Sequence, residues 1–352
     1  MLTATRTLTS RTLTRTRVTA RIIARGSVLG RYEILGAIGS GARADVWLGR
    51  ATEDGGLARP LAIRTARPGL VADPGQRATF LRQGAIAAAI RHANVVEVID
   101  AGEVGGVLYQ VMALVEGGSL ARLVARAVEV TGAPLPVAVT LGIAVDALRG
   151  LHALHEGVDA SGAAGGVAPR GVSARSIRVG LDGVARVSDF GAAEADVRAM
   201  GVVLWEALTG VRLREGGEAC AALDDVSASP VVDPRTHVKE LPAAVVEVVM
   251  RALAPAPESR HASAEAMAEA LTEAARAARL GLDRREIARA VSALTVSRTR
   301  EAVGEASGIA DPTPTVVTDT TARARPRLAV RLLPVVVLAA VAALTMAIPL
   351  LR

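Results

Sequence analysis

Several residue types are scarce in this chain of 352 residues. Aromatic residues make up 2% of it, and Cys220, Asn94 and Lys239 are its only cysteine, asparagine and lysine. A single cysteine excludes an internal disulfide and fits a reducing compartment. With few aromatics to stack on bases, and with basic and acidic residues interleaved, the net charge of +6 does not indicate a nucleic-acid-binding surface. We expect no nucleic-acid partner.

The N-terminal tract is also short of acidic residues, with none before Glu33. It is rich in Thr and Arg, and no apolar run in it is long enough for a signal peptide. Such a segment cannot bury a core, so residues 1–26 are predicted to be a disordered tail. Two alternatives stay open: a polycation held near anionic lipid, and a start site assigned too far upstream.

Apolar residues account for 51% of the chain, enough for a sizeable core. Short alternating or apolar runs separated by glycine-rich turns predict an antiparallel sheet, with one helix between them. Longer Ala/Leu/Val patterns then predict a mainly helical part. The runs predicted as strands are 32–38, 45–49, 61–65, 95–100 and 107–112; the predicted helices are 76–91, 136–156, 195–209, 242–254 and 263–280. This order is an α+β fold with a small lobe over 27–115 and a large lobe over 116–281.

The C-terminal part combines a linker with a long apolar run. Residues 282–331 are predicted to hold one more amphipathic helix within 282–306 and a Pro/Thr-rich linker. Residues 332–351 carry no charge, and twenty helical residues span about 30 Å, the thickness of a bilayer's hydrocarbon core. Four arginines precede this run and one follows it, which predicts a single transmembrane helix with the rest of the chain in the cytoplasm.

Residues 31–50, RYEILGAIGSGARADVWLGR, resemble the glycine-rich loop of the protein kinases, whose pattern is G-x-G-x-x-G-x-V. Gly39, Gly41 and Val46 match the pattern, and Ala44 replaces the third glycine. This motif alone is weak, but further segments are similar to the same family in the same order. The chain is thereby identified as similar to the bacterial eukaryotic-type serine/threonine protein kinases, which implies a two-lobed kinase-like fold.

The resemblance places Arg64, in LAIR, where the family has the lysine that holds the α- and β-phosphates of ATP. It places Gln83 where the family has the glutamate that pairs with that lysine. Both members of the ion pair are replaced, and an Arg64–Gln83 contact is one substitute for it. Met112 falls at the gatekeeper position, and the hinge that ends at Val115 would offer backbone groups to an adenine.

Residues 167–193 align without a gap with the family's catalytic loop and Asp-Phe-Gly motif. The loop arginine is Arg170, but the aspartate that accepts the substrate's proton has become Gly171. The asparagine that binds a second Mg²⁺ has become Ser176. Asp189 remains as a metal ligand, followed by Phe190. The resemblance therefore implies a catalytic loop without its usual chemical groups.

The segment that docks the substrate in these kinases is missing as well. Four residues separate Gly191 from Asp196, where the family has an activation segment of about thirty residues ending in Ala-Pro-Glu. Asp196 matches the buried aspartate that bonds the catalytic-loop backbone. Arg260 matches the arginine that pairs with the absent glutamate, and it is expected either to be solvated or to meet another carboxylate.

Two hypotheses on function remain open. The first is a pseudokinase, anchored in the cell membrane by a single span, that acts as a signalling scaffold or regulator with unidentified protein partners. Binding of ATP and Mg²⁺ through the glycine-rich loop, the hinge and Asp189 stays open within it. The alternative is an active ATP-dependent serine/threonine kinase with displaced groups, for instance Asp182 as the base.

Overall fold

The computed structural model describes residues 20–21, 23–41, 44–52, 59–160, 171–189, 193–213, 231–295 and 317–318. All of them belong to one compact unit that extends to Asp319. Four predicted features lie outside the described residues. These are residues 1–19 of the N-terminal tail, the site residues Arg170 and Phe190, and the transmembrane span 332–351.

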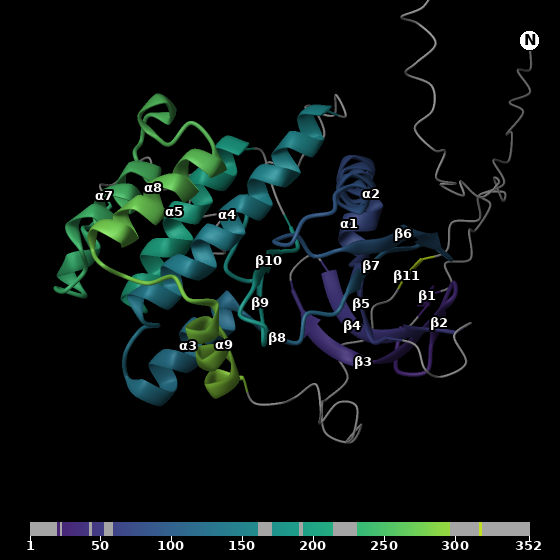
Figure 1. Ribbon diagram of the computed structural model, residues 1–352. Coiled ribbons are helices and arrows are strands. Elements are labelled where there is room, and N and C mark those ends of the chain that lie inside the picture. The colour runs from purple at the N-terminus through teal and green to yellow at the C-terminus, as the bar shows by residue number, and fades with distance from the viewer. Residues whose placement is uncertain are drawn as a thin grey trace, which may run out of the picture. The chain divides into compact units, whose positions relative to one another are not determined.

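The small lobe is built on an antiparallel sheet with the strand order β2-β3-β4-β5-β7-β6 (Figure 1). Its strands are β2 (Val28–Leu29), β3 (Tyr32–Ser40), β4 (Ala44–Ala51), β5 (Leu61–Ala66), β6 (Val98–Val104) and β7 (Val107–Ala113). Side chains such as Tyr32, Trp47 and Ile63 form the core on one face, as the alternation of apolar residues predicts. The predicted strands are confirmed, with ends that differ by a few residues.

Two helices accompany this sheet, α1 (Pro68–Ala72) and α2 (Pro74–Ala89), whereas the sequence predicts one, at 76–91. The carboxylate of Asp73 caps α2 by accepting from the backbone N–H groups of Gly75 and Gln76. Gly84 lets α2 lie close to the sheet, because a Cβ there would be 2.9 Å from Nε2 of Gln110. The amide of Gln110 in turn donates to the carbonyl of Phe80 on α2, which fixes the helix on the sheet.

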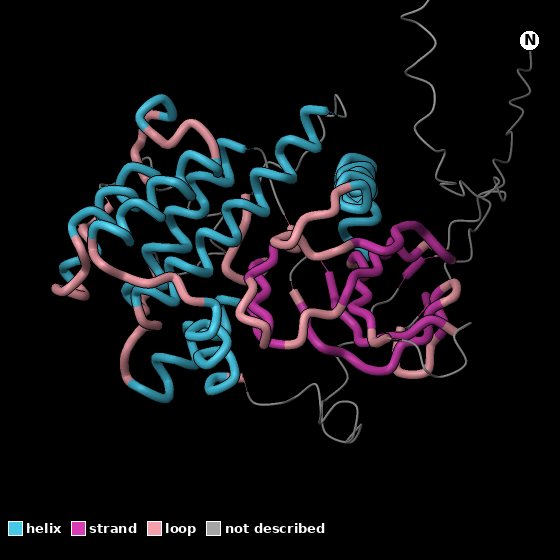
Figure 2. The backbone as a smooth tube through the Cα atoms, in the orientation of Figure 1, coloured by secondary structure: helices cyan, strands magenta, loops and turns pink. Residues whose placement is uncertain are grey.

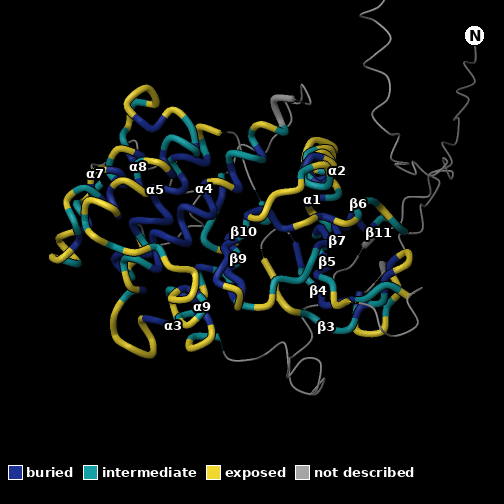
Figure 3. The backbone as a smooth tube through the Cα atoms, viewed as in Figure 1, coloured by how far each residue is buried: buried dark blue, intermediate teal, exposed yellow. Residues whose placement is uncertain are grey.

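The large lobe is mainly helical (Figure 2). Its helices are α3 (Leu120–Thr131), α4 (Val137–Ala160), α5 (Ala193–Thr209), α7 (Ala243–Ala252), α8 (Ala264–Ala277) and α9 (Arg284–Leu294), with short 3₁₀ turns at Pro234–Thr236 and Pro257–Ser259. The helices α4 and α5 are buried through most of their length, and α7 and α8 pack on them (Figure 3). The four helices predicted between 136 and 280 are confirmed.

One described helix is apolar and long enough to cross a membrane by length and composition alone. It is the stretch Val137–Gly157 of α4, and 72% of its most apolar window is buried inside the protein. That burial is typical of the central helix of a folded domain, so α4 is a core helix of the large lobe.

A second sheet, with the order β10-β9-β8, lies where the two lobes meet (Figure 1). Its strands are β8 (Gly117–Ser119), β9 (Ile177–Gly180) and β10 (Ala185–Val187). The segment between α2 and β6 is bonded to β10, because Asn94 donates to the carbonyl of Ala185 at 3.0 Å and Val96 N–H donates to Val187 at 2.9 Å. The only asparagine of the chain thus joins the lobes.

Two boundaries differ from the sequence prediction. The small lobe begins before residue 27, because Ile23 is 5% exposed and packs in its core. The pair β1 (Ala20–Arg21) and β11 (Val317–Thr318) forms a separate two-stranded ladder, so part of the predicted tail is ordered backbone. At the other end, the helix predicted within 282–306 is α9, which ends at Leu294.

Candidate functional site

The glycine-rich turn between β3 and β4 is closed by its own hydrogen bonds. Gly39 lies opposite Val46 in the strand register, and Gly41 N–H donates to the carbonyl of Ala44 at 2.9 Å. The side chain of Asp45, buried beneath the turn, accepts from Ser40 at 2.8 Å and from Arg67 at 3.0 Å. The loop that would cradle phosphates therefore has part of its polar capacity satisfied internally.

Arg64, on β5, reaches across to the large lobe. Its Nη2 lies 2.8 Å from Oδ2 of Asp189, and its guanidinium carbon lies 5.9 Å from the ring centre of Phe80 on α2. The side chains of Arg64 and Asp189 are 21% and 38% exposed. Arg64, aligned with the family's phosphate-binding lysine, thus forms an ion pair with Asp189, which is aligned with the family's metal ligand. The Arg64–Gln83 contact stays a prediction, with Gln83 half-buried on α2.

The hinge is apolar on its inner side. Met112 is buried in a cluster with Ala62, Val96 and Val98, and the half-buried side chains of Val46 and Val115 pack against this cluster. Ala113 N–H donates to the carbonyl of Glu97 at 2.9 Å. The residues expected near an adenine therefore come together, although one hinge N–H is already used.

The catalytic loop is held from below by Asp196 on α5. Its Oδ1 accepts from Val172 N–H at 2.5 Å, and its Oδ2 lies 2.8 Å from Nε2 of His155 on α4. The carboxylate has no solvent exposure, so these bonds satisfy a group whose burial would otherwise be costly. The structure places this residue against the loop backbone, as the sequence predicts.

Gly171, next to Val172 in the loop, is crowded. A Cβ built there would lie 2.7 Å from the carbonyl oxygen of Ala195 and 2.8 Å from the Cβ of Ala199. Both atoms belong to α5, which starts directly after the shortened activation segment. The position aligned with the catalytic base therefore lacks a side chain and the space for one.

The hydroxyl of Ser176 serves the loop itself. It donates to the carbonyl of Ser173 at 2.9 Å and accepts from Ser173 N–H at 3.0 Å. The carbonyl of Ser176 also accepts from Ser188, the residue directly after β10, so the loop is tied to the strand that leads to Asp189. Ser176 stabilises the turn where the family has a metal-binding asparagine.

Arg260 forms an ion pair with another carboxylate, that of Glu194. Its guanidinium donates to the carbonyls of Ala254 at 2.8 Å and Pro255 at 2.7 Å, and its Nη1 lies 3.4 Å from Oε1 of Glu194. The side chain of Arg260 is 6% exposed and that of Glu194 is 66% exposed. Two carbonyls inside the protein hold the arginine, and the ion pair adds a solvent-facing contact.

These residues do not fit a two-metal kinase centre. The part of the chain that the structure describes contains no group of three or more His, Cys, Asp and Glu side chains able to hold a metal ion. Asp189 is the single remaining ligand candidate, and Arg64 already neutralises it.

The sequence did not predict some of the residues that contact the site. Phe80 beneath Arg64, Glu194 beside Arg260, and the Arg67–Asp45 pair under the glycine-rich turn belong to no motif. Their partners lie 16 to 66 residues away in the chain. The one available signal was chemical: a buried arginine needs an acceptor, and Glu194 is the first carboxylate after Asp189.

Comparison with known proteins agrees with this geometry. Residues 32–195 match the family of protein tyrosine and serine/threonine kinases. The tyrosine-protein kinase MasK of Myxococcus xanthus is 28% identical over 278 residues, which are 69% of this chain and 42% of MasK. The serine/threonine-protein kinase PknB of Mycobacterium leprae is 28% identical over 276 residues, with coverage of 67% and 42%. The match therefore spans less than half the length of these relatives.

A solved structure supports the same fold. The kinase domain of Mycobacterium tuberculosis PknI superposes with a TM-score of 0.57 and 23% identity, covering 72% of this chain and 99% of the PknI domain. Together with the matched family and the ordered motifs, this similarity identifies the domain that the two lobes form. Residues 32–195 thus match the protein kinase family, the chain is similar to its bacterial eukaryotic-type members, and the described lobes have the protein-kinase fold.

Proposed function

We propose that this chain is a pseudokinase: a membrane-anchored protein with a kinase fold that transfers no phosphate and acts as a signalling scaffold or regulator. Protein kinases use ATP and Mg²⁺, and catalysis by them depends on positioning and on charge stabilisation. A family member that lacks the groups for both tasks still has the folded surface of a kinase, but it cannot transfer phosphate. Its partners would then be proteins that recognise this surface.

The position of the base carries the proposal. Gly171 has no side chain, and the backbone of Ala195 and the Cβ of Ala199 occupy the space where one would begin. A general base contributes roughly 10²–10⁴ in rate. Because α5 fills the space, a neighbouring side chain cannot enter it without moving the helix. The loss is therefore built into the backbone as well as the sequence.

The pairing of Arg64 with Asp189 adds to this loss. An active kinase needs a cation on the phosphates and an anion on the metal, at two separate places. Here the two side chains lie 2.8 Å apart and neutralise each other. Nucleotide binding would have to break this ion pair, so the proposal includes at most weak binding of ATP, with little dependence on Mg²⁺.

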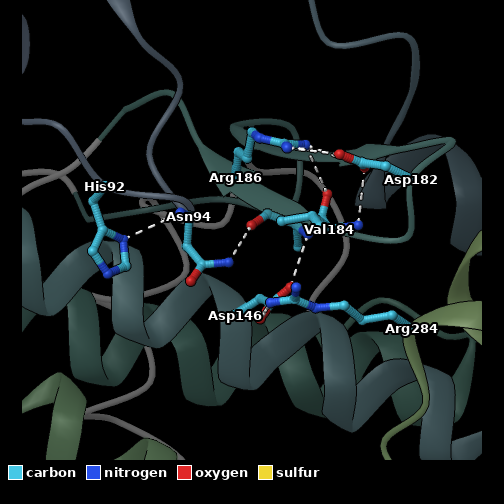
Figure 4. Close-up of polar contacts among 8 residues, drawn as sticks. His92, Asn94, Asp146, Asp182, Val184, Arg186 and Arg284 are labelled. Carbon is cyan, nitrogen blue, oxygen red and sulfur yellow. Dashed lines mark hydrogen bonds and ion pairs between the residues drawn. The ribbon is translucent and has the colours of Figure 1, made fainter.

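The active-kinase alternative relies on Asp182 as a displaced base. Figure 4 shows Asp182 turned toward Arg186, with Oδ2 2.7 Å from Nη2 of that arginine. Val184 N–H also donates to Asp182 at 3.1 Å. Burial acts to raise the pKa of Asp182, but the hydrogen bonds from Arg186 and Val184 outweigh it and lower the pKa. A carboxylate committed to a strand turn and held ionised in this way is a weak base.

The membrane anchor in this proposal rests on the sequence. Residues 332–351 are twenty uncharged residues, with arginines concentrated before them. This charge bias favours a cytoplasmic kinase-like domain at the cell membrane. Deleting 332–351 should move the protein from the membrane fraction to the soluble fraction. A chain that stays soluble with this segment present would contradict the anchor.

The catalytic part is tested with the purified full chain in detergent, incubated with Mg²⁺ and γ-labelled ATP and with a generic basic protein as acceptor. We expect no label on the chain itself or on the acceptor. A matched Asp189→Ala variant separates weak transfer by this chain from a contaminating kinase. Label that appears with the unaltered chain and disappears with Asp189→Ala would overturn the proposal.

The same samples report on nucleotide binding through thermal unfolding. A ligand that binds only the native state raises the midpoint by mass action. We expect a small ATP-dependent rise or none, and no added effect of Mg²⁺. A large rise that requires Mg²⁺ would show that Asp189 leaves Arg64 to bind metal, and would favour a nucleotide-switched regulator.

A further inference from the structure

Arg178 occupies an unusual place in the sheet at the junction of the lobes. It lies on β9 between Ile177 and Val179, both fully buried in the core of the large lobe. Because successive side chains on a strand point to opposite faces, Arg178 points away from that core. An arginine therefore lies on the face of the sheet opposite the large-lobe helices.

That face is turned toward the small lobe. Asp189 follows β10 of the same sheet, and its carboxylate meets Arg64 on β5 of the small lobe. In Figure 1 the strands β8, β9 and β10 lie between the large-lobe helices and the small-lobe sheet. Arg178 is half-buried there, close in the sheet to the end of the hinge.

A second arginine lies beside it. Arg178 is directly opposite Ser119 in the pairing of β8 with β9. Ser119 caps α3, and its hydroxyl accepts from the backbone N–H of Arg122 at 3.4 Å. The exposed side chain of Arg122 thus starts in the first turn of α3, next to the register partner of Arg178. Burial lowers the pKa of Arg178, and the like charge of Arg122 lowers it further.

The two guanidinium groups lack a counter-charge within the described residues. No carboxylate in that part of the chain forms an ion pair with either of them. Their neighbours behave differently. Arg126, one turn along α3, pairs with Glu129 at 2.8 Å, and Arg186, opposite Arg178 on β10, pairs with Asp182 at 2.7 Å. Two cations held together in this way create a positive electrostatic potential that attracts an anion.

We propose that Arg122 and Arg178 bind the phosphate group of a small phosphorylated molecule at the lobe junction. Two guanidinium forks supply enough donors for several phosphate oxygens, and together they balance a doubly charged group. A small molecule is favoured because the side chain of Arg178 is half-buried, which leaves a folded partner little access to it. The proposal goes beyond the pseudokinase proposal and does not depend on it, since it requires neither Mg²⁺ nor Asp189.

Thermal unfolding and calorimetric titration of the full chain test this site, with inorganic phosphate as the probe and without Mg²⁺. Sodium chloride at matched ionic strength controls for screening. We expect a saturable rise in the unfolding midpoint with phosphate. Arg178→Leu and Arg122→Ala should each weaken phosphate binding by about tenfold or more, as expected for a charge-assisted contact. Arg126→Ala, which removes a paired arginine from the same helix, should bind as the unaltered chain does.

The stability of the variants gives an independent readout. Removing one of two like charges relieves their repulsion, so Arg122→Ala should raise the unfolding midpoint in phosphate-free buffer of low salt. This variant alters an exposed side chain, so it folds even if Arg178→Leu does not. An unchanged phosphate response in Arg122→Ala, or an equal loss in Arg126→Ala, would overturn the proposal.

A second titration separates the source of the phosphate group. It compares inorganic phosphate with a phosphoserine peptide at equal concentration. Equal or weaker binding of the peptide supports a small ligand. Binding of the peptide at least tenfold tighter, and lost in Arg122→Ala, would overturn the small-ligand assignment in favour of a phosphopeptide site.

Discussion

The residues that hold the catalytic loop from below and the residues at the positions of the reacting groups above it differ in how far they keep the kinase pattern. Below the loop, Asp196 is fully buried and holds Val172 and His155. Above it, Gly171 lies at the position aligned with the family's base, and Asp189, aligned with the family's metal ligand, is paired with Arg64. The scaffold contacts of a kinase remain, while its chemical groups have been replaced or neutralised.

This difference has a physical reason. When a buried polar group loses its hydrogen-bond partner, the free energy of unfolding falls by about 1–3 kcal/mol. The need for stability is therefore a sufficient reason for the fold to keep Asp196. Catalytic groups, in contrast, lie at the surface of a cleft and often strain the fold, so their loss is neutral or favourable for stability. A kinase fold that no longer needs transfer would be expected to change first where it has changed here.

The largest effect is expected at the scaffold. Asp196→Ala removes a carboxylate that accepts from Val172 N–H and contacts His155, and it leaves these groups unsatisfied in the core. The free energy of unfolding should fall by about 2–6 kcal/mol, because two groups lose their partner in the core at about 1–3 kcal/mol each. Urea unfolding followed by circular dichroism measures this fall.

Glu194→Ala is the matched control for that variant. Glu194 lies two residues earlier on α5 and contacts Arg260, but its side chain is 66% exposed. Its loss should change the free energy of unfolding by less than about 1 kcal/mol. Similar losses for both variants would mean that the buried carboxylate gives no special support to the loop.

The next effect concerns the reacting face. Gly171→Asp restores the carboxylate that an active kinase has, but its Cβ must push against the carbonyl of Ala195 and the methyl group of Ala199. We expect a loss of about 1–3 kcal/mol in the free energy of unfolding, as in other overpacked sites, and no gain of phosphate transfer. Urea unfolding and labelled ATP measure the two quantities on the same preparation.

Gly69→Ala serves as its control, because a Cβ at Gly69 in α1 meets nothing within 4 Å. That change should leave stability unaltered or raise it by up to about 1 kcal/mol. If Gly171→Asp gained transfer instead, α5 would have to yield easily, and the loss of activity that we propose would reduce to one missing side chain.

The sequence predicted the scaffold better than the contacts of the site. Alternating runs such as 61–65 and long apolar patterns such as 136–156 lie close to β5 and α4, because periodicity is a local property. The sequence suggested a contact of Arg64 with the amide of Gln83 on α2, which stays a prediction, but it did not predict the ion pair of Arg64 with Asp189, 125 residues away. Crowding at Gly171 was likewise invisible, since it depends on how α5 packs against the loop.

The Arg64–Asp189 ion pair should have a small effect on stability. The two side chains are 21% and 38% exposed, and exposed pairs typically contribute below about 1 kcal/mol. A double-mutant cycle with Arg64→Ala and Asp189→Ala, measured by urea unfolding at low and high salt, should give a coupling of that size that shrinks with salt. A coupling well above it would make the pair part of the scaffold and remove the contrast between the two faces.

The smallest effect is a pH dependence in the large-lobe core. Burial lowers the pKa of His261 below its ordinary 6.5, the carbonyl of Val248 acts in the opposite direction, and Arg251 lowers it further. Between the folded pKa and 6.5 the unfolded chain binds more protons than the folded one, so stability is complete above 6.5 and falls as the pH drops through this window.

The difference between urea midpoints at pH 5.5 and 7.5 should therefore shrink in His261→Gln. Arg251→Gln removes a positive charge that holds the pKa down, so it should shrink the difference partly. An unchanged difference in His261→Gln would mean that the acid sensitivity of the fold arises elsewhere.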